Sequence, residues 1–494
     1  MKIIVYCILV LFYLTLAACS GAQNQVEIMM PETLDDVLAI ALTRRESIAR
    51  PTYDRLVQVT EGRTALMIDP FELRRCLRHH VGEEISANDA LHDTYILFKA
   101  LAGAYGAYIY FGGDEVFLPV KSEIIDVINT RKTWTPQALT ELFHAKLSQV
   151  ISDGHFYIGD MSLQANYQFF TYSGRFYGSG NRFMCGVSGL YVRELLLPCL
   201  PDFILELNDT FRLSICESGN GLFYTPVVVL RINAEEVGPY ELKIIYDDGT
   251  TDVVPLRALV PECCGNLDAP PSLNFIDCVP VVSVRWMGNP VGIHTPNVHA
   301  RLFLEYAYEL SKEPVLILDL RCNMGGYGNL PEKWFYNLTG EIISPNRHYL
   351  RLTGFDSHWE LLYGLDSFMH EAMLPFDDNH SIADTSPDIV TSSNQLIIVL
   401  IDRRTVSAAE IMTDLAFSME NTLVIGQNTG GFLLSNVHRI HLRRSNMNIH
   451  MGFGLSVFHE DHFQEGIGFA PDIWVTGDAL TAALGMLRTH FSEE

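Results

Sequence analysis

A serine at the junction of a strand and a helix is the first residue whose position could support chemistry. A buried strand is expected over 395–401, and Ser407 follows a short polar turn at the start of a helix that runs to about Met419. The helix N-terminus would stabilise negative charge that develops beside Ser407 and Ala408. Other strand–turn–helix nucleophiles share this logic, although the Gly-x-Ser-x-Gly spelling is missing here. A serine in this place is also a common N-cap, so Ser407 indicates a nucleophile only together with further residues.

A second turn, rich in glycine, follows another buried strand. The strand is expected over 315–320, and the turn after it ends in Gly325 and Gly326. Glycine lets a backbone N–H group come close to a ligand atom and adopt a positive φ. A strand that runs into such a turn can donate an N–H group to the oxyanion of an acyl-transfer reaction. The same pattern is also that of an ordinary tight turn.

Proton transfer from a serine needs a base, and two loop segments supply candidates. His155 follows Asp153 and Gly154 in a glycine turn, and Glu465 opens a glycine-punctuated loop that continues to Ile473. A neutral imidazole has a reference pKa of about 6.5 and can accept a hydroxyl proton at neutral pH. A carboxylate can fix the tautomer of that ring and stabilise the imidazolium. A histidine or a glutamate in a loop of this kind more often has a structural role than a catalytic one.

Taken in order, these segments resemble the tail-specific, or C-terminal processing, serine peptidase family. The family shows an Asp-Gly-His-like segment, a strand ending in Asp-x-Arg-x-Asn-x-Gly-Gly, a Ser-Ala-x-Glu after a strand, and a Gly-x-x-Pro-Asp. The corresponding residues here are 153–155, 319–326, 407–410 and 468–472. The resemblance covers about 152–159 and 281–475, and it is specific because the motifs keep their order and context.

Membership of this family implies a ClpP/crotonase-like α/β catalytic core that hydrolyses peptide bonds. The implied site residues are the nucleophile Ser407 and, for the oxyanion hole, the backbone N–H groups of Gly325 or Gly326 and of Ala408. Family members usually carry small residues where Cys322 and Met324 stand in this chain. Bulk at those two positions would narrow the oxyanion region.

The family uses two kinds of base. One branch pairs the serine with a lysine in a Thr-x-Gly-Lys context, but this chain reads Thr-Gly-Gly-Phe at 429–432 and has no lysine after Lys333. The other branch, which resembles the tricorn core, uses a histidine together with a glutamate near the end of the domain. We therefore expect His155 as the base, with Glu465 as the first candidate for orienting it and Asp153 as the second.

Glu410 is a further candidate for the orienting network. It lies one helical turn after Ser407 and is expected mainly to support the helix or the loop below it. The tricorn-like branch often has a serine before its histidine, where Gly154 stands here. That difference affects how the histidine is oriented and leaves its role as base unchanged.

The N-terminal part of the chain is expected to be helical. Apolar residues recur at helix spacing in 28–150, which predicts a helical subdomain. One of its helices is expected over 136–147, with Thr135 as N-cap and Pro136 at the first helical position. Residues 151–175 then carry the histidine into the catalytic region.

A β-rich insert is expected to separate the histidine from the rest of the site. Short alternating or β-branched runs, such as 203–207, occur within 176–278, and both a generic β-domain and a PDZ-like domain fit them. From 279 to 488 strands and helices alternate, which indicates an α/β serine peptidase core. The fold class predicted for the whole chain is therefore α/β, with an N-terminal helical subdomain and a β-rich insert.

The first residues predict export. A charged Lys2 and an apolar run that ends in small residues are typical of a signal peptide over 1–18. The Leu-Ala-Ala-Cys ending resembles a bacterial lipobox, in which Cys19 is acylated, and residues 19–27 would then be a lipid-anchored linker. We expect a lipoprotein of the bacterial cell envelope, with its body in the periplasm or outside the cell. A plain signal peptide with an incidental Cys19 is the alternative.

Charge and cysteine content limit the partners. The 494 residues carry a net charge of −25, which repels nucleic acid phosphate, so we expect a peptide or protein substrate and no nucleic acid. Contact with the membrane is expected only through the lipid anchor, and serine chemistry needs no cofactor and no metal. Eight cysteines remain after Cys7 and Cys19 are set aside, and disulfides and free thiols both stay open for them.

A protein that keeps the peptidase fold without catalysis is the main alternative. The residues Cys322 and Met324 and the missing lysine are consistent with a lipoprotein that binds peptides or apolar ligands where the active peptidases of the family bind substrate. Ser407, His155 and Glu465 together speak for an active hydrolase. A purely structural envelope lipoprotein would not need a glycine-lined site.

Overall fold

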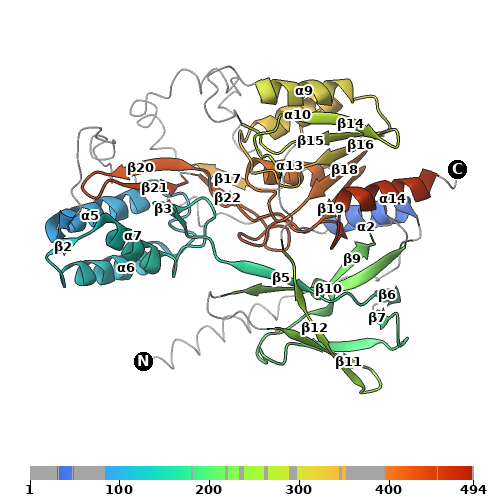
Figure 1. Cartoon of the computed structure of the whole chain (residues 1–494), viewed down its shortest axis with the longest axis horizontal. Coiled ribbons are helices and arrows are strands. Elements are labelled where there is room, and N and C mark those ends of the chain that lie inside the picture. Colours follow the sequence, from blue (N-terminus) through green and yellow to red (C-terminus); the bar gives the residue numbers. More distant parts are fainter. Residues whose placement is uncertain are drawn as a thin grey trace.

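One large mixed sheet with helices on both of its faces forms the centre of the molecule (Figure 1). The computed structural model describes residues 31, 33–46, 48, 84–179, 182–216, 221–232, 239–260, 265–288, 298–343, 348–351, 395–452 and 454–491. Within them, the expected α/β class is confirmed at the level of a mixed fold with a large sheet.

Parallel strands make up the middle of this sheet. They lie in the spatial order β15, β16, β18, β19 and β23, and each is parallel to the next. Their bounds are Val279–Ser283, Val315–Asp319, Leu396–Ile401, Thr422–Gly426 and Ile473–Trp474. At one edge β14 (Ser272–Ile276) pairs antiparallel with β15. Loops that follow β16 and β18 therefore leave the sheet at the same edge.

The pleat of the parallel strands sends alternate side chains into two apolar layers. Leu316 and Leu318 of β16 pack in the layer of α9, α10 and α13, whereas Ile317 packs in the layer of α2 and α14. These helices span Val298–Glu309, Leu330–Thr339, Ala408–Phe417, Leu34–Glu46 and Ala479–Phe491. Helices on both faces explain why β16 and β18 are continuous apolar runs that are buried along their whole length.

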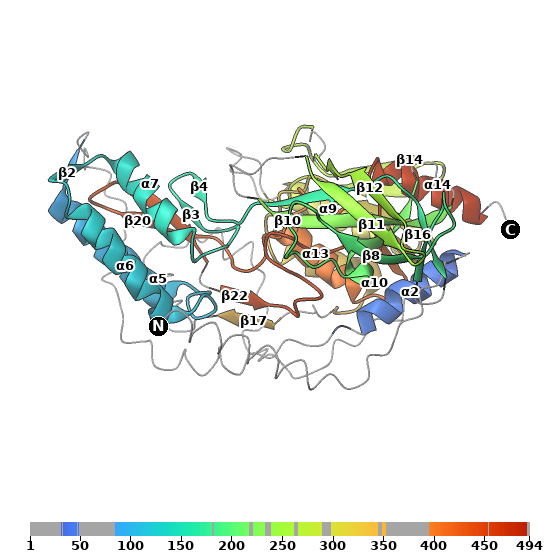
Figure 2. The same cartoon turned by 90° about the horizontal axis from the view of Figure 1, so that it is seen from below.

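The helices of the expected N-terminal subdomain stand at one end of the elongated molecule (Figure 2). They are α5 (Ala87–Ala104), α6 (Gly113–Ile128) and α7 (Pro136–Leu147), with the short strands β1 (Ile85–Ser86) and β2 (Thr133–Trp134) beside them. The Thr135 side chain accepts a hydrogen bond from the Ala138 N–H group at 3.1 Å, so it caps α7 as expected.

A hairpin from the C-terminal half of the chain reaches over to these helices (Figure 1). It consists of β20 (His438–Leu442) and β21 (Met447–Met451), and β21 pairs with β3 (Tyr157–Ile158), which pairs with β4 (Met161–Ser162). The hairpin residues Ile440 and Ile449 share one apolar core with Phe143 and Phe156. The segment just after His155 is thus held between the helices and the catalytic part of the chain.

Strands of the expected insert, together with β5 from the histidine-bearing segment 151–175, continue the large sheet. Beyond β23 the order is β9, β10, β5 and β13, with β6 and β7 branching from β10. Their bounds are Phe211–Ile215, Leu222–Arg231, Tyr167–Thr171, Arg257–Ala258, Phe176–Ser179 and Arg182–Cys185. A smaller sheet of β8, β11 and β12 (Val192–Leu196, Glu241–Tyr246 and Thr251–Pro255) lies beside them. The short helix α8 spans Leu207–Thr210, and β17 (His348–Arg351) pairs with β22 (Gly454–Val457).

The first described helix does not join the other N-terminal helices. Although α2 lies within the expected helical segment 28–150, it packs on the large sheet together with α14. Arg45 at its end donates hydrogen bonds to the carbonyl oxygens of Met419 at 3.1 Å and Thr422 at 2.8 Å, and it pairs with Asp472. These backbone carbonyls lie beside the start of β19, and they attach α2 to the catalytic core.

The predicted signal peptide, Cys19 and the linker 19–27 lie outside the described residues. Among the helices that are described, none is both long and apolar enough to cross a membrane.

Candidate active site

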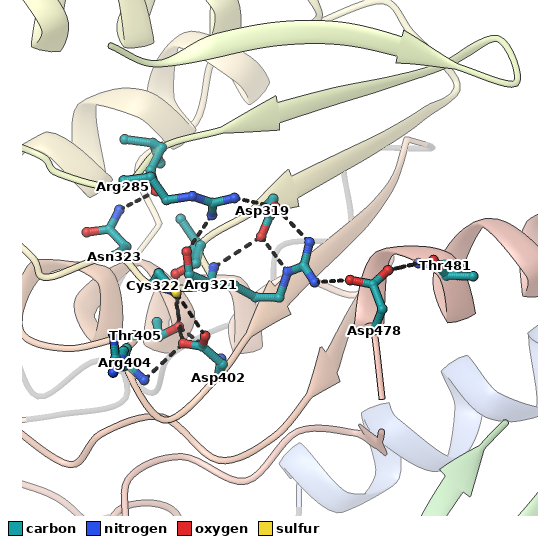
Figure 3. Close-up of polar contacts among 12 residues, drawn as sticks. Arg285, Asp319, Arg321, Cys322, Asn323, Asp402, Arg404, Thr405, Asp478 and Thr481 are labelled. Atoms are coloured by element: carbon teal, nitrogen blue, oxygen red, sulfur yellow. Dashed lines mark hydrogen bonds and ion pairs between the residues drawn. The ribbon is translucent and has the colours of Figure 1, made fainter. Parts of the chain in front are cut away.

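The glycine-rich loop after β16 is held by a buried carboxylate, as Figure 3 shows. Asp319 ends the strand, and its oxygens accept hydrogen bonds from Arg285 Nη2 at 3.0 Å and from Arg321 Nε at 2.9 Å. Burial opposes ionisation of Asp319, but the two guanidinium groups outweigh it and lower the pKa of the carboxyl. Arg321 also pairs with Asp478 at 2.6 Å, so the loop is anchored to the segment before α14.

A second carboxylate fastens the nucleophile loop to the glycine-rich loop (Figure 3). Asp402 directly follows β18, and its Oδ1 accepts hydrogen bonds from the backbone N–H groups of Cys322 and Arg404, each at 2.9 Å. The hydroxyl of Thr405 donates to the Leu320 carbonyl at 2.9 Å. These hydrogen bonds join the two loops and fix the glycines relative to the start of α13.

Ser407 adopts a backbone conformation that is rare for a residue with a side chain. Its φ is 56° and its ψ is −120°. Such a conformation costs about 1–3 kcal/mol and persists only where the surroundings hold it. The Ser407 N–H group donates to Glu410 Oε2 at 3.0 Å, and the Ser407 hydroxyl lies within hydrogen-bond distance of the imidazole of His155.

Glu410 organises the loop below the nucleophile. Its carboxylate is fully buried and also accepts hydrogen bonds from Thr429 Oγ1 at 2.6 Å and from the N–H groups of Gly431 at 2.7 Å and Phe432 at 2.8 Å. Burial raises the pKa of Glu410, and these donors only partly offset it. Glu410 thus supports the helix start and the 429–432 loop, the role that the sequence favoured for it.

His155 lies against the serine although 252 residues separate them in the chain. The distance from His155 Nε2 to Ser407 Oγ is 3.2 Å. The ring is 8% exposed, and burial lowers the pKa of His155, while the charge of Asp153 and the backbone of Ser435 act in the opposite direction. A lowered pKa keeps the imidazole neutral at neutral pH, which is the form that can accept a proton.

Glu465 does not form the hydrogen bond to His155 that the sequence led us to expect. Its Oε1 accepts the Gly154 N–H group at 2.8 Å, and its Oε2 accepts those of Leu434 at 2.9 Å and Leu433 at 3.1 Å. Within the described residues His155 Nδ1 has no hydrogen-bond partner. The reason is geometric, because both carboxylate oxygens already accept backbone N–H groups, one from the histidine loop and two from the segment 433–434. Glu465 therefore positions the loop and not the ring directly.

Asp153 is the other carboxylate near the histidine. Its Oδ1 accepts the backbone N–H group of His155 at 2.9 Å, and its Oδ2 accepts the hydroxyl groups of Tyr105 and Ser435, each at 2.7 Å. Sequence reasoning named neither hydroxyl, because Tyr105 lies in a helical segment 48 residues away and Ser435 is 282 residues away. No local pattern in the sequence marks either of them.

The expected oxyanion donors differ in their availability. The Gly325 N–H group donates to Asn323 Oδ1 at 2.8 Å and is therefore occupied. The N–H groups of Gly326 and Ala408 donate no hydrogen bond within the part of the chain that is described. A Cβ atom on Gly325 would lie 2.6 Å from Ser407 Cβ, so the glycine is needed for the loop to approach the nucleophile. Gly326 and Ala408 are thus the pair that can bind an oxyanion.

The cysteines fall into different classes. Cys322, next to the oxyanion loop, is disulfide-bonded. Cys185, Cys199 and Cys278 are free thiols. Cys76, Cys263 and Cys264 lie outside the described residues. Met324 is 42% exposed, so its side chain is not packed in the core of the loop.

A hydroxyl, a neutral imidazole and unused backbone N–H groups therefore meet at one edge of the sheet. This set can carry out nucleophilic acyl transfer, in which the imidazole removes the hydroxyl proton and the N–H groups stabilise the oxyanion. Within the described residues no group of histidine, cysteine and carboxylate side chains could hold a metal ion.

Comparisons with known proteins concern both a sequence family and solved structures. Residues 299–475 match the model of peptidase family S41. The chain is similar to the solved structure of mature CPAF complexed with lactacystin, with 15% identity, a TM-score of 0.42, and coverage of 82% of this chain and 97% of that chain. It is also similar to the photosystem II D1 C-terminal processing protease, with 12% identity, a TM-score of 0.37, and coverage of 81% and 96%.

A third similar structure is the tricorn protease, with 13% identity, a TM-score of 0.36, and coverage of 82% of this chain and 37% of that chain. Among curated proteins we found no match. The matched stretch 299–475 contains the glycine-rich loop, Ser407 and the Pro-Asp motif, in the order that the family requires. The match over residues 299–475 therefore supports a serine peptidase of family S41, the tail-specific, C-terminal processing peptidases, and a peptidase is a hydrolase.

Proposed function

We propose that the protein is an endopeptidase that cleaves exported proteins or peptides through an acyl-enzyme at Ser407, with His155 as general base. The observation that carries this proposal is the 3.2 Å distance between His155 Nε2 and Ser407 Oγ. Side chains 252 residues apart meet at hydrogen-bond distance at the edge of the sheet where the glycine loop also ends.

The acylation step follows from these positions. His155 Nε2 takes the hydroxyl proton while Ser407 Oγ forms a bond to the carbonyl carbon of the scissile peptide. The carbonyl oxygen becomes an oxyanion that the N–H groups of Gly326 and Ala408 can bind, and Ala408 adds the field of the N-terminus of α13. Removal of one such donor from another serine protease lowers kcat by about 10²–10³.

Collapse of the tetrahedral intermediate breaks the carbon–nitrogen bond. The imidazolium gives its proton to the leaving amine, and the acyl group stays on Ser407 as an ester. A water molecule then attacks the ester with His155 again as base, which releases the acid product and restores the hydroxyl. Burial lowers the pKa of His155, and the neutral ring that both attacks require is therefore the form present at neutral pH.

Export and lipid anchoring are part of the same proposal. They are supported by the sequence of residues 1–19, which combines a signal peptide with a lipobox-like ending. Mass spectrometry of the mature N-terminus tests this, because we expect a diacylated or triacylated Cys19. A Cys19→Ser variant should lose the lipid and be recovered from the soluble fraction, and an unmodified mature N-terminus elsewhere would overturn the anchor.

A ClpP/crotonase-like core and a PDZ-like insert also remain proposals. The α/β layers around β16 and β18 support the first, since the site lies at the carboxyl ends of parallel strands. The separate sheet of β8, β11 and β12 supports an insert with a core of its own. Preferential cleavage near a free C-terminus would support the PDZ-like assignment.

Labelling with a fluorophosphonate probe tests the proposed nucleophile. Attack of Ser407 Oγ on phosphorus with loss of fluoride should give an adduct that peptide mass spectrometry places on Ser407. Ser407→Ala should abolish labelling, and His155→Gln should slow it at least about 100-fold. Ser188→Ala, an exposed serine in the insert, is the matched control and should label like the wild type.

Digestion of a protein substrate separates the two functions that the sequence left open. Internal cleavage of casein, with new N-termini away from the chain ends, would establish an endopeptidase. A folded wild-type protein that neither labels nor cleaves, but binds peptides, would instead be an inactive peptidase-fold lipoprotein.

A further inference from the structure

A buried carboxylate beneath the histidine loop connects three distant parts of the chain. Asp153 is fully buried, and its oxygens accept hydrogen bonds from the Tyr105 hydroxyl at 2.7 Å, the Ser435 hydroxyl at 2.7 Å and the His155 backbone N–H group at 2.9 Å. Tyr105 belongs to the helical end and Ser435 to the segment before β20. The three donors together fix the position of the carboxylate.

We propose that Tyr105 and Ser435 are positioning residues of the peptidase, whose hydroxyl groups hold the Asp153 carboxylate in place so that it orients His155 and stabilises the imidazolium formed during catalysis. This inference rests on the proposed role of His155 as base. It assigns to the helical end of the molecule a part in positioning the base, through the hydroxyl of Tyr105.

The position of the Tyr105 hydroxyl is determined by the helices and not by the catalytic core. Tyr105 is the C-cap of α5, and its N–H group donates to the Leu101 carbonyl at 3.2 Å. Its ring is 1% exposed and packs edge-on against Phe156, with ring centroids 5.1 Å apart. Phe156 is the residue after His155, so the same aromatic ring locates both the carboxylate and the histidine loop.

Ser435 is fixed from the opposite side. It forms an isolated bridge with Leu455, and the Ser456 N–H group donates to the Leu434 carbonyl at 2.8 Å. The backbone of Ser435 lies near enough to the imidazole to favour its protonated form, although Nδ1 makes no well-formed hydrogen bond to a described residue. An acceptor at Nδ1 would select the tautomer that leaves the Nε2 lone pair for Ser407. Catalytic hydrogen bonds are often long before substrate binds.

Other charged groups near the histidine are less suited to stabilise the imidazolium. The carboxyl of Glu465 is held on backbone N–H groups, and burial and the charge of Asp153 raise its pKa well above the usual value. Burial likewise raises the pKa of Glu410, which faces the backbone of Ser407 and the 429–432 loop. Burial and the charge of Asp153 also raise the pKa of Tyr105, so its hydroxyl stays protonated and remains a donor. Asp153 is the carboxylate that directly contacts the histidine residue.

The rate of fluorophosphonate labelling, measured from acidic to alkaline pH on the full-length protein, tests the network without knowledge of the natural substrate. In Asp153→Asn the negative charge that raises the pKa of His155 is lost, so the acid limb of the profile should move to lower pH. The plateau rate should fall about 100-fold, because the imidazolium loses its counter-charge. A change in packing alone would lower the plateau and leave the limb in place.

Tyr105→Phe keeps the ring against Phe156 and removes only the hydroxyl. We expect the labelling rate to fall about tenfold, and to fall no further when the change is made in Asp153→Asn, because the two residues act through one carboxylate. Ser435→Ala should behave like Tyr105→Phe, and Ser435→Thr, which retains a hydroxyl, should restore most of the rate. Thermal melting of each variant gives the folded fraction to which the rate is normalised.

Tyr108→Phe is the matched control. Tyr108 is also a buried tyrosine of the helical end, and its hydroxyl donates to a carboxylate, Asp114 Oδ1, at 2.9 Å. This variant should label at the wild-type rate. The network proposal is overturned if the wild type labels and Tyr105→Phe, Ser435→Ala and Asp153→Asn all keep its rate and pH profile. It is also overturned if Tyr105→Phe still slows labelling in Asp153→Asn. In both cases the assignment of Ser407 as nucleophile is unaffected. If the wild type itself does not label, the proposed function fails.

Discussion

Glu410 Oε2 accepts the backbone N–H group of Ser407 at 3.0 Å, so a carboxylate one turn into α13 holds the strained residue at its start. The same carboxylate binds the 429–432 loop through Thr429, Gly431 and Phe432. The conformation of the nucleophile and the position of the loop beside the base therefore depend on one buried side chain.

Replacement of Glu410 by glutamine should destabilise the protein and slow labelling together. The amide group would turn a donor toward backbone N–H groups, and leaving such buried donors without an acceptor costs about 1–3 kcal/mol. Urea unfolding would measure the loss, and the fluorophosphonate rate of the folded fraction would show whether Ser407 has moved. Glu309→Gln, an exposed carboxylate at the end of α9, should change neither quantity.

Gly325→Ala should nearly abolish activity while the fold is retained. Gly325 has a φ of 84°, and a Cβ atom there would meet Ser407 Cβ at 2.6 Å and the Ala408 nitrogen at 3.0 Å. Displacement of the nucleophile by about 1 Å costs about 100-fold in rate. The matched control is Gly249→Ala, because Gly249 also has a φ of 84° but has open space around it. Full labelling of Gly325→Ala would show that the loop does not approach the nucleophile this closely.

The contribution of Glu465 to stability should depend on pH. Its pKa is raised well above the usual value by burial and by the charge of Asp153, so the folded state binds its proton more tightly than the unfolded state, whose glutamate pKa is about 4.3. Such a group stabilises the fold fully below the unfolded pKa, and the contribution is lost as the pH rises through the folded pKa. The unfolding free energy of the wild type should therefore exceed that of Glu465→Gln by an amount that decreases as the pH rises. A difference that grows with pH would contradict the raised pKa.

The ion pair between Arg45 and Asp472 should be essential for docking α2 on the core. Both side chains are almost fully buried, and removal of one partner leaves an uncompensated charge that costs about 3–5 kcal/mol. We expect Asp472→Asn to show this loss in urea unfolding. Glu123→Gln, which breaks the exposed pair of Lys146 and Glu123, should cost no more than about 1 kcal/mol. Equal losses in the two variants would show that α2 is not held by this pair.

Local patterns in the sequence were sufficient for many of the elements. The helix expected at 136–147 coincides with α7, and the strands expected at 315–320 and 395–401 correspond to β16 and β18. The run 203–207 is not a strand, since only Leu205 forms an isolated bridge there. Ile204 is 79% exposed, whereas Leu205 and Leu207 pack against the apolar core beside β8, and α8 begins at Leu207. These two apolar residues of the run are therefore partly buried without forming a strand.

The sequence by itself determined the order of the motifs, the nucleophile candidate and the exclusion of a lysine base at 429–432, because each depends on residue types at short spacing. Only the tertiary structure decided that Glu465 binds the backbone of a loop and that the Gly325 N–H group is already bonded to Asn323. It also decided that the hydroxyl groups of Tyr105 and Ser435 both donate to Asp153. Those contacts join residues up to 311 positions apart. Their partners are selected by burial and by competition among many equivalent donors, which no local pattern encodes.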